Sequence, residues 1–273
     1  MNAQRPSPGL RSSKRSIRES SFLWFCLGMG ALVLAWELGS RIGGSDLLFP
    51  GPFLVLKRFI LLLPQAHFHQ AFVYSFLRVI LGIVISVPLG VGVGIVAGMD
   101  TRKGAFFRPL FSIIAATPVM SVILIAFLIL GSEQTPVFTA FLMVFPVMAA
   151  TTIEGLRSVD PRLAELFRVY PVSRGREIRS LYIPTLLPFI IGGLRSSLSL
   201  CWKVVVAAEV LVQPFQGLGT RMQMAKAQLE TPELFAWTLA TVIAAALSQG
   251  LFTVLLRLSP FASRYPPYSR KGP

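Results

Sequence analysis

Residues 160–184 read DPRLAELFRVYPVSRGREIRSLYIP, and this polar stretch lies between two long apolar runs of the chain. It is the larger part of a polar segment that covers residues 154–183. Connections between packed helices are usually only a few residues long. A polar insertion of 30 residues, placed once between apolar runs, therefore indicates a structured element with its own role.

The first part of this insertion predicts a short amphipathic helix over residues 160–170. Asp160 is a good N-cap, and Pro161 suits the first helical position. Apolar side chains then follow at the i, i+3, i+4 and i+7 spacing of one helix face: Leu163, Leu166, Phe167 and Tyr170. We expect this face to be buried in a groove of another protein, because it is too apolar to be left in water. The alternative is a helix that lies on lipid headgroups.

The rest of the chain is too apolar for a soluble domain. Of its 273 residues, 53% are hydrophobic and only 14% are charged, and the mean hydropathy is +0.66. Runs of about 20 apolar residues are long enough to cross a hydrocarbon layer as helices, and they are continuous rather than alternating, which argues against a β-barrel. The sequence predicts an all-α membrane protein with about six transmembrane helices, at residues 22–42, 78–99, 109–130, 137–153, 184–211 and 234–256.

Several local features divide the chain further. Residues 1–20 are predicted to be a flexible basic tail, 21–47 the first transmembrane helix and an outer turn, 48–258 the main transmembrane domain, and 259–273 a second tail. A short amphipathic helix is expected at 53–63 on the outer surface. Pro118 should kink the third span, and residues 131–136 should form a tight turn after it. Glycines in the second span predict a smooth face for close helix packing: Gly82, Gly90, Gly92, Gly94 and Gly98.

The distribution of basic residues predicts the orientation in the membrane. If both termini are cytoplasmic, the inner segments hold eighteen Lys and Arg residues and the outer segments hold five. Cytoplasmic loops normally carry this excess. The formal net charge of +14 is therefore explained by the anionic membrane surface and does not indicate a nucleic-acid partner. A cleaved signal peptide is the competing interpretation of the first apolar run, but no small-residue cleavage site follows it.

Few residues suggest chemistry of their own. Cys26 and Cys201 lie in apolar runs and predict neither a disulfide nor a metal site. His67 and His69 are placed in an outer loop without further ligands nearby. The sequence also lacks the phosphate-binding loop, the zinc-protease motif and the serine-hydrolase motif. We therefore expect no enzyme activity and no cofactor on this chain.

Two ionisable residues inside the fifth predicted span are candidates for a solute path. Lys203 and Glu209 are six residues apart, so they do not share one helix face. Ionisable groups in a membrane usually face an interior path or a partner. Snorkelling or pairing with another helix is the alternative for both. Glu37 and Arg195 are ambiguous in the same way, and an interfacial structural role is favoured for them.

The polar insertion resembles the cytoplasmic loop of ABC importer permeases, whose pattern is E-A-A-x3-G-x9-I-x-L-P. Glu165 stands at the acidic position, Pro184 at the final proline, and every spacing between them is kept. The departures are Leu166 and Phe167 at the two small residues and Pro171 at the glycine, while Leu181 and Ile183 take the two aliphatic positions. Residues 48–52, 192–195 and 207–211 are similar to other signatures of the family, so the likeness covers 48–258. It points to the nitrate, sulfonate and taurine branch.

The resemblance implies a fold and a set of partners. The fold would be that of a type I importer permease with a cytoplasmic coupling helix, in a bacterial inner membrane with both termini inside. The coupling residues would be Glu165, Phe167, Arg168, Pro171, Gly175 and Pro184. The partners would be an ATPase dimer that binds ATP and Mg²⁺, a second permease copy, an external solute-binding protein and membrane lipid. The movement of the coupling helix would rock the membrane helices between two packed arrangements.

The solute implied by the resemblance is a small anion such as nitrate, a sulfonate or taurine. An alternative within the same machine is a pyrimidine of the thiamine-precursor type or another small metabolite. Two alternatives come from other classes: a secondary carrier, which would show inverted repeats and paired intramembrane acids, and a membrane-embedded enzyme, which would show clustered catalytic residues. The sequence shows none of these features.

Overall fold

The computed structural model describes residues 9–45, 48–170 and 172–258, and all regular structure in these ranges is helical. Long helices predominate, and a π-helical turn at Ile178–Tyr182 joins two of the others without a break. The helices are α1 (Gly9–Ile42), α2 (Pro52–Leu62), α3 (Ala66–Met99), α4 (Thr101–Ala116), α5 (Val119–Arg157), α6 (Pro161–Val169), α7 (Arg174–Glu177), α8 (Ile183–Val212), α9 (Leu218–Ala227) and α10 (Thr231–Leu258).

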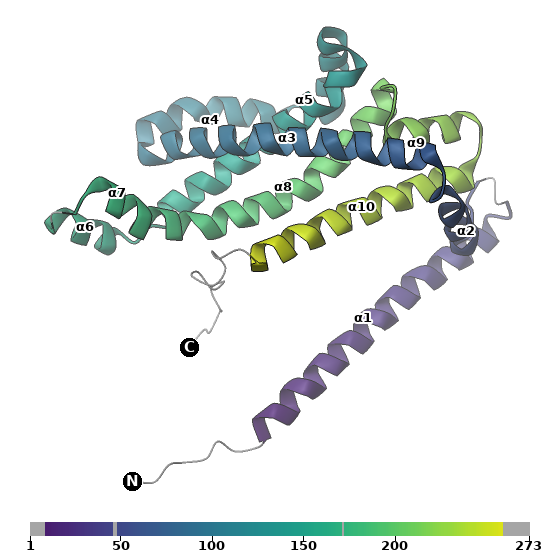
Figure 1. The fold of residues 1–273 in the computed structure, drawn as a ribbon, viewed down its shortest axis with the longest axis horizontal. Helices are drawn as coiled ribbons and strands as arrows, with labels where there is room; N and C mark the ends of the chain where they lie inside the picture. The colour runs from purple at the N-terminus through teal and green to yellow at the C-terminus, as the bar shows by residue number, and fades with distance from the viewer. Residues whose placement is uncertain (1–8, 46–47, 171, 259–273) are drawn as a thin grey trace.

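The bundle is built from α3, α4, α5, α8 and α10, and its two ends carry different short helices. Figure 1 shows α6 and α7 at one end, together with the last turns of α3. The opposite end carries α2, α9 and the first turns of α3 and α10. The loops that the charge distribution assigns to the cytoplasm therefore share one end of the bundle.

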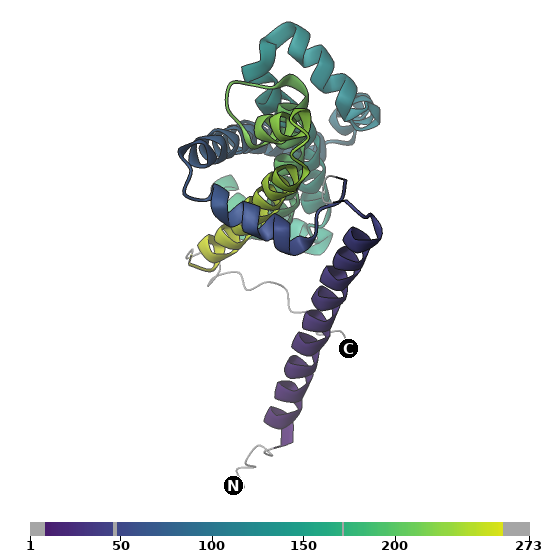
Figure 2. The same cartoon turned by 90° about the vertical axis from the view of Figure 1, so that its right-hand side faces the viewer.

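Helix α1 stands apart from this bundle in both Figure 1 and Figure 2. Among its described side chains, 23–42, those near the C-terminal end make contact, and the Trp36 ring lies 6.1 Å from the Phe235 ring of α10. The indole Nε1 of Trp36 also donates a hydrogen bond to the Pro50 carbonyl oxygen at 3.0 Å. None of its apolar window is buried within this chain. A helix of this kind must find its packing partners outside the chain, in lipid or in protein.

Five helical segments in the described ranges are long and apolar enough to cross a membrane: Leu23–Ile42, Ala66–Met99, Val119–Arg157, Arg174–Val212 and Thr231–Leu258. The predicted third span, 109–130, is not one helix. It is divided between α4 and the start of α5, because Thr117 is extended (φ −74°, ψ 126°) before Pro118, which has no N–H to continue the helix. The predicted kink at Pro118 is thus a complete break.

A second bend lies within α5. Gly131 has φ +76° and ψ 178°, a conformation open essentially only to glycine. Residues 131–136, expected as a tight turn, are instead a single-residue bend after which the helix continues to Arg157.

Four glycines of α3 allow its backbone to approach α5 closely, as the sequence predicts. A methyl carbon added at Gly94 would lie 2.6 Å from Cβ of Thr152, well inside van der Waals contact. Gly92 is the exception, since nothing lies within 4 Å of such a carbon there. The glycines that contact α5 are Gly82, Gly90, Gly94 and Gly98.

The core of the bundle is aromatic at the end that carries α2 and α9. Phe68 of α3 stacks on Trp237 of α10 with ring centroids 5.5 Å apart, and Trp202 of α8 is fully buried nearby. Large buried rings of this kind hold helices at fixed separations. Helix α2, predicted over 53–63, packs against α10 at this end.

Three expectations need correction or fall outside the described residues. Residues 9–20, predicted to be part of a flexible tail, belong to α1, since Ser, Arg and Lys do not prevent a helix from continuing. His67 and His69 lie in the first turn of α3, not in a loop. Residues 1–8 and the predicted tail at 259–273 lie outside the described residues.

Candidate functional site

Helix α6 begins where the sequence predicts. The Asp160 carboxylate accepts a hydrogen bond from the backbone N–H of Arg162 at 2.8 Å, and Pro161 occupies the first turn. This cap satisfies one of the free N–H groups at the start of a helix. The helix ends at Val169, and Tyr170 is already extended.

The apolar face of α6 is largely uncovered by the rest of the chain. Leu163 is 47% exposed, Leu166 is 52% exposed, and Tyr170 is 62% exposed. Phe167 is only partly exposed, and Glu165 is exposed. Because this helix lies at the tip of the bundle (Figure 1), its apolar side chains are available to a partner.

Helix α6 follows α5 after a short link of three residues, 158–160. The hydroxyl Oγ of Ser158, directly after α5, donates to the Gly155 carbonyl oxygen at 2.8 Å. Gly155 itself lies against α8, where an added methyl carbon would be 3.0 Å from Leu186 and 3.2 Å from Phe189. The link therefore joins α6 to the end of α5, which packs on α8.

The other predicted coupling residues lie along the same polar insertion. Arg168 is part of α6. Gly175 is exposed in α7, and Pro184 lies in the first turn of α8. Pro171 lies outside the described residues.

The two predicted path residues lie in very different surroundings. Lys203 is exposed near the middle of α8 and forms no hydrogen bond or ion pair with the described residues. Glu209 is fully buried near the end of the same helix. Lys203 and Glu209 thus lie on different faces of α8, one exposed and one buried.

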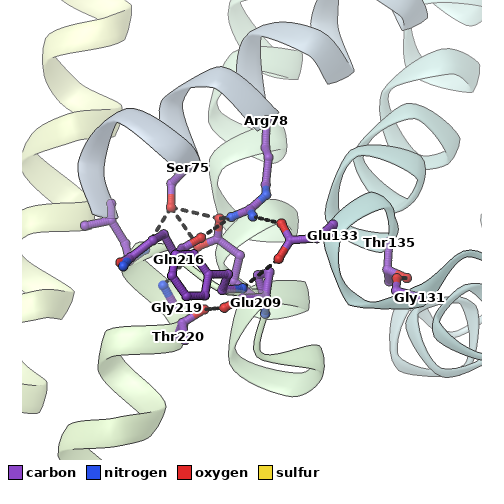
Figure 3. Close-up of polar contacts among 12 residues, drawn as sticks. Ser75, Arg78, Gly131, Glu133, Thr135, Glu209, Gln216, Gly219 and Thr220 are labelled. Atoms are coloured by element: carbon purple, nitrogen blue, oxygen red, sulfur yellow. Dashed lines mark hydrogen bonds and ion pairs between the residues drawn. The ribbon is translucent and has the colours of Figure 1, made fainter. Parts of the chain in front are cut away.

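Glu209 is the centre of a buried polar network, shown in Figure 3. Its carboxylate accepts hydrogen bonds from Ser75 Oγ at 2.7 and 2.8 Å, from Arg78 Nη1 at 2.8 Å and from the Gly219 backbone N–H at 3.0 Å. These donors come from α3 and α9, so one side chain of α8 connects three helices. A buried carboxylate needs such partners to offset the loss of its hydration.

The loop between α8 and α9 is shaped to close over Glu209. Gln213 adopts a left-handed conformation (φ 45°) that ends α8, and Ser75 Oγ accepts a hydrogen bond from the Leu218 N–H at 2.8 Å. A methyl carbon added at Gly217 or Gly219 would lie 2.6 Å from atoms of Glu209. Only glycine lets this loop approach the carboxylate so closely.

Arg78 extends the network from the buried centre to the surface. Its side chain is 6% exposed, and its Nη2 group donates to Glu133 Oε2 of α5 at 2.7 Å. The Glu133 side chain is 54% exposed, and its Oε1 accepts the Phe215 backbone N–H at 2.7 Å. The network therefore ends in a half-exposed carboxylate two residues after the bend at Gly131 (Figure 3).

Sequence reasoning missed Ser75, Arg78 and Glu133. Arg78 begins the second predicted span and Glu133 lies in the predicted turn at 131–136, and the sequence assigns no partner to either. Their charges are the signal: an arginine at the start of one apolar run and a glutamate between two others should pair, because unpaired ions are costly there. Glu37 and Arg41 form an ion pair with each other at 2.8 Å. Arg195 makes one long contact, 3.5 Å to Thr253 Oγ1.

The described residues contain no group of three or more His, Cys, Asp or Glu side chains that could hold a metal ion. The polar groups of the network are occupied by one another. The site therefore consists of a projecting amphipathic helix, an unpaired lysine within a span and a buried ion network.

Comparison with known proteins identifies the family. Residues 86–260 match the family model described as the binding-protein-dependent transport system inner membrane component, and the chain belongs to this family. A probable ABC transporter permease protein of Brucella melitensis is 32% identical over 216 residues, which cover 76% of this chain and 87% of the relative.

The same comparison supports the predicted branch. The taurine transport system permease protein of Escherichia coli is 26% identical over 237 residues, covering 84% of this chain and 86% of the relative. Permease proteins named for bicarbonate, aliphatic sulfonates and nitrate are 24–27% identical. The resemblance to nitrate, sulfonate and taurine permeases is thereby confirmed.

The fold is also that of a solved transporter. The structure of the MetNI methionine ABC transporter matches with a TM-score of 0.51 at 17% identity, covering 69% of this chain and 92% of that chain. The predicted type I importer permease fold is confirmed at this level. The chain is thus a permease subunit of an ABC importer, and it belongs to a family of inner-membrane components.

Proposed function

We propose that this chain forms half of the solute path of an ATP-driven importer of a small anion, and that a separate ATPase drives it. The proposal that the chain forms part of a solute path rests on one observation, its membership in the permease family. The anion is supported by the named substrates of the relatives, which include taurine, sulfonates, nitrate and bicarbonate. Family membership sets aside the secondary carrier and the membrane-embedded enzyme.

Helix α6 would be the docking element for the ATPase. Its apolar face is exposed, it follows α5 after a link of three residues, and it lies at the end of the bundle where the basic loops gather. A groove on a partner would bury Leu163, Leu166 and Tyr170, while Glu165 and Arg168 would contact its rim and Phe167 would anchor the helix. The ATP and Mg²⁺ would bind to that partner.

The remaining parts of the assembly follow from the same proposal. Two permease copies, identical to each other, would enclose the path, and an external binding protein would deliver the solute. Both termini and α6 would face the cytoplasm of a bacterial cell, consistent with the excess of Lys and Arg in the segments at that end.

Charge reversal at Glu165 tests the docking surface. We expect Glu165→Arg to reduce the ATPase that co-purifies with the detergent-extracted permease by about tenfold, since a like charge at an interface costs roughly 1.4 kcal/mol or more. Glu230→Arg is the matched control, because Glu230 is an exposed carboxylate at the opposite end of the bundle. Equal co-purification of wild type and Glu165→Arg would remove Glu165 from the docking surface.

Lys203 tests the nature of the solute. A cation exposed within a span would attract an anion along the path. In vesicles that contain the complete importer, we expect Lys203→Met to lower the uptake of labelled taurine, nitrate or bicarbonate, whichever is carried, and Lys203→Arg to retain it. Normal anion uptake by Lys203→Met would exclude this lysine. Uptake of a neutral pyrimidine in place of all three anions would favour the thiamine-precursor alternative.

A further inference from the structure

The Glu133 carboxylate lies between two hydrogen-bond donors that belong to other parts of the fold. Arg78 Nη2 of α3 binds one oxygen at 2.7 Å, and the Phe215 N–H of the loop after α8 binds the other oxygen at 2.7 Å. Both distances are typical of charge-assisted hydrogen bonds. We call these two donors, Arg78 Nη2 and Phe215 N–H, the outer cradle.

The two carboxylates bound to Arg78 are held very differently. Glu209 is fully buried and accepts hydrogen bonds from three donor groups. Its removal from the network would leave buried donors, including the charged Arg78, without their acceptor. Glu133 is 54% exposed and receives only the two donors of the outer cradle. Glu133 can therefore leave into water at small cost, whereas Glu209 cannot.

The hydrogen-bond donors of the network, rather than its net charge, favour an acceptor in the outer cradle. One guanidinium, Arg78, faces two carboxylates, and Glu209 alone neutralises it. When Glu133 leaves, Arg78 Nη2 and the Phe215 N–H lose their acceptor, although the cradle is still positioned by Glu209 and by the loop. An external oxyanion would restore the hydrogen bonds that Glu133 makes in this conformation.

We propose that the outer cradle is an oxyanion subsite of the solute path, and that Glu133 occupies it when no solute is bound. The Glu133 carboxylate shows which ligand fits the outer cradle. The ligand needs two oxygens spaced like those of a carboxylate, each accepting one hydrogen bond. A sulfonate, a carboxylate, a bicarbonate or a nitrate ion has this arrangement. The bend at Gly131 lies two residues before Glu133, where a change in backbone direction would withdraw the side chain.

This subsite rests on the proposed transport of an anion, but it adds a position and a competing side chain. Lys203 lies six residues before Glu209 on α8, about 9 Å at the helical rise but on a different face of the helix, so it is not part of the outer cradle.

The experiment uses the full chain, purified in detergent, with sodium methanesulfonate as the probe. In Glu133→Ala the outer cradle has no internal acceptor, so the probe should bind and stabilise the protein. At a concentration about tenfold above its dissociation constant, we expect the melting temperature of Glu133→Ala to rise by about 3 °C relative to sodium chloride at equal ionic strength. The rise should saturate with concentration.

Two proteins serve as controls in the same titration. In the wild type, Glu133 competes with the probe, so the expected rise is below about 1 °C at the same concentration. Glu37→Ala removes another carboxylate from an arginine ion pair, but from the pair with Arg41 on α1, so it should behave like the wild type. Glu133→Ser provides a second way to empty the outer cradle and should respond like Glu133→Ala.

The outcomes separate this proposal from the wider function. No rise beyond chloride in Glu133→Ala and Glu133→Ser, or an equal rise in all the proteins, would overturn the oxyanion subsite. Neither result bears on whether an ATPase co-purifies with the chain, which tests the importer itself.

Discussion

Replacing Glu209 by glutamine tests how strongly the buried network holds the bundle together. The carboxylate accepts hydrogen bonds on both oxygens, from Ser75, Arg78 and Gly219. A glutamine has one oxygen, so its NH₂ group would face either the guanidinium or the Gly219 N–H. One buried charge-assisted hydrogen bond would be lost, and a donor would be left facing another donor.

The size of the effect follows from burial. Removing the charge of one partner in a buried ion pair costs about 3–5 kcal/mol of unfolding free energy, because the charge of the other partner stays unpaired in the interior. For a chain of this size, each kcal/mol shifts the melting temperature by roughly 2–4 °C, which predicts a fall of roughly 6–20 °C. Thermal unfolding of the detergent-purified chain, followed by tryptophan fluorescence, measures this fall, since Trp202 and Trp237 are fully buried.

Glu133→Gln is the matched control for this experiment. It changes the same atom of the same residue type, bound to the same arginine, but the side chain is 54% exposed. An exposed pair contributes about 0–1 kcal/mol, so the melting temperature should fall by about 4 °C at most. If Glu209→Gln and Glu133→Gln melt at the same temperature, burial of Glu209 does not set the strength of the network, and our reasoning is wrong.

Three further substitutions test the packing and the local structure. Gly94→Leu should prevent the close approach of α3 and α5 and sharply lower the yield of folded protein, while Gly92→Leu, which meets open space, should not; size-exclusion chromatography compares them. Gly131→Ala should lower the unfolding free energy by about 1–3 kcal/mol, because Gly131 has a φ of +76°. Gly250→Ala in α10 is the control and should not destabilise the protein. Equal melting temperatures of the two variants would show that the backbone at residue 131 does not require glycine. Asp160→Ala should weaken the start of α6 by about 1 kcal/mol and speed amide exchange in that helix, and unchanged exchange would show that the cap is dispensable.

The sequence predicts those parts of the protein that are encoded in neighbouring residues. The apolar runs identify the spans because a helix satisfies its own backbone hydrogen bonds and can cross lipid wherever about 20 apolar residues follow one another. Helix α6 is predicted almost to the residue, since Asp160, Pro161 and the apolar spacing act within a few turns. The glycine face of α3 is also a local pattern, although only the structure shows that Gly92 is not part of it.

Predictions fail where a single residue changes the direction of the chain. Thr117 and Pro118 divide the third predicted span, and Gly131 bends α5 where a turn was expected. In both cases the sequence contains the breaking residue, but the composition of the run does not reveal whether the helix kinks, stops or continues. The packing of the neighbouring helices determines which of these three outcomes occurs.

By itself, then, the sequence determined a polytopic helical membrane protein with one projecting amphipathic helix, and it predicts that the excess of positive charge faces the cytoplasm. The tertiary structure alone decided that Arg78 binds two glutamates. Glu209 is 131 positions further along the chain, and Glu133 is 55 positions further along. The physical reason is that an ion in a low-dielectric interior takes the partner that helix packing brings within about 3 Å. That packing depends on every helix of the bundle, and no local pattern of residues encodes it.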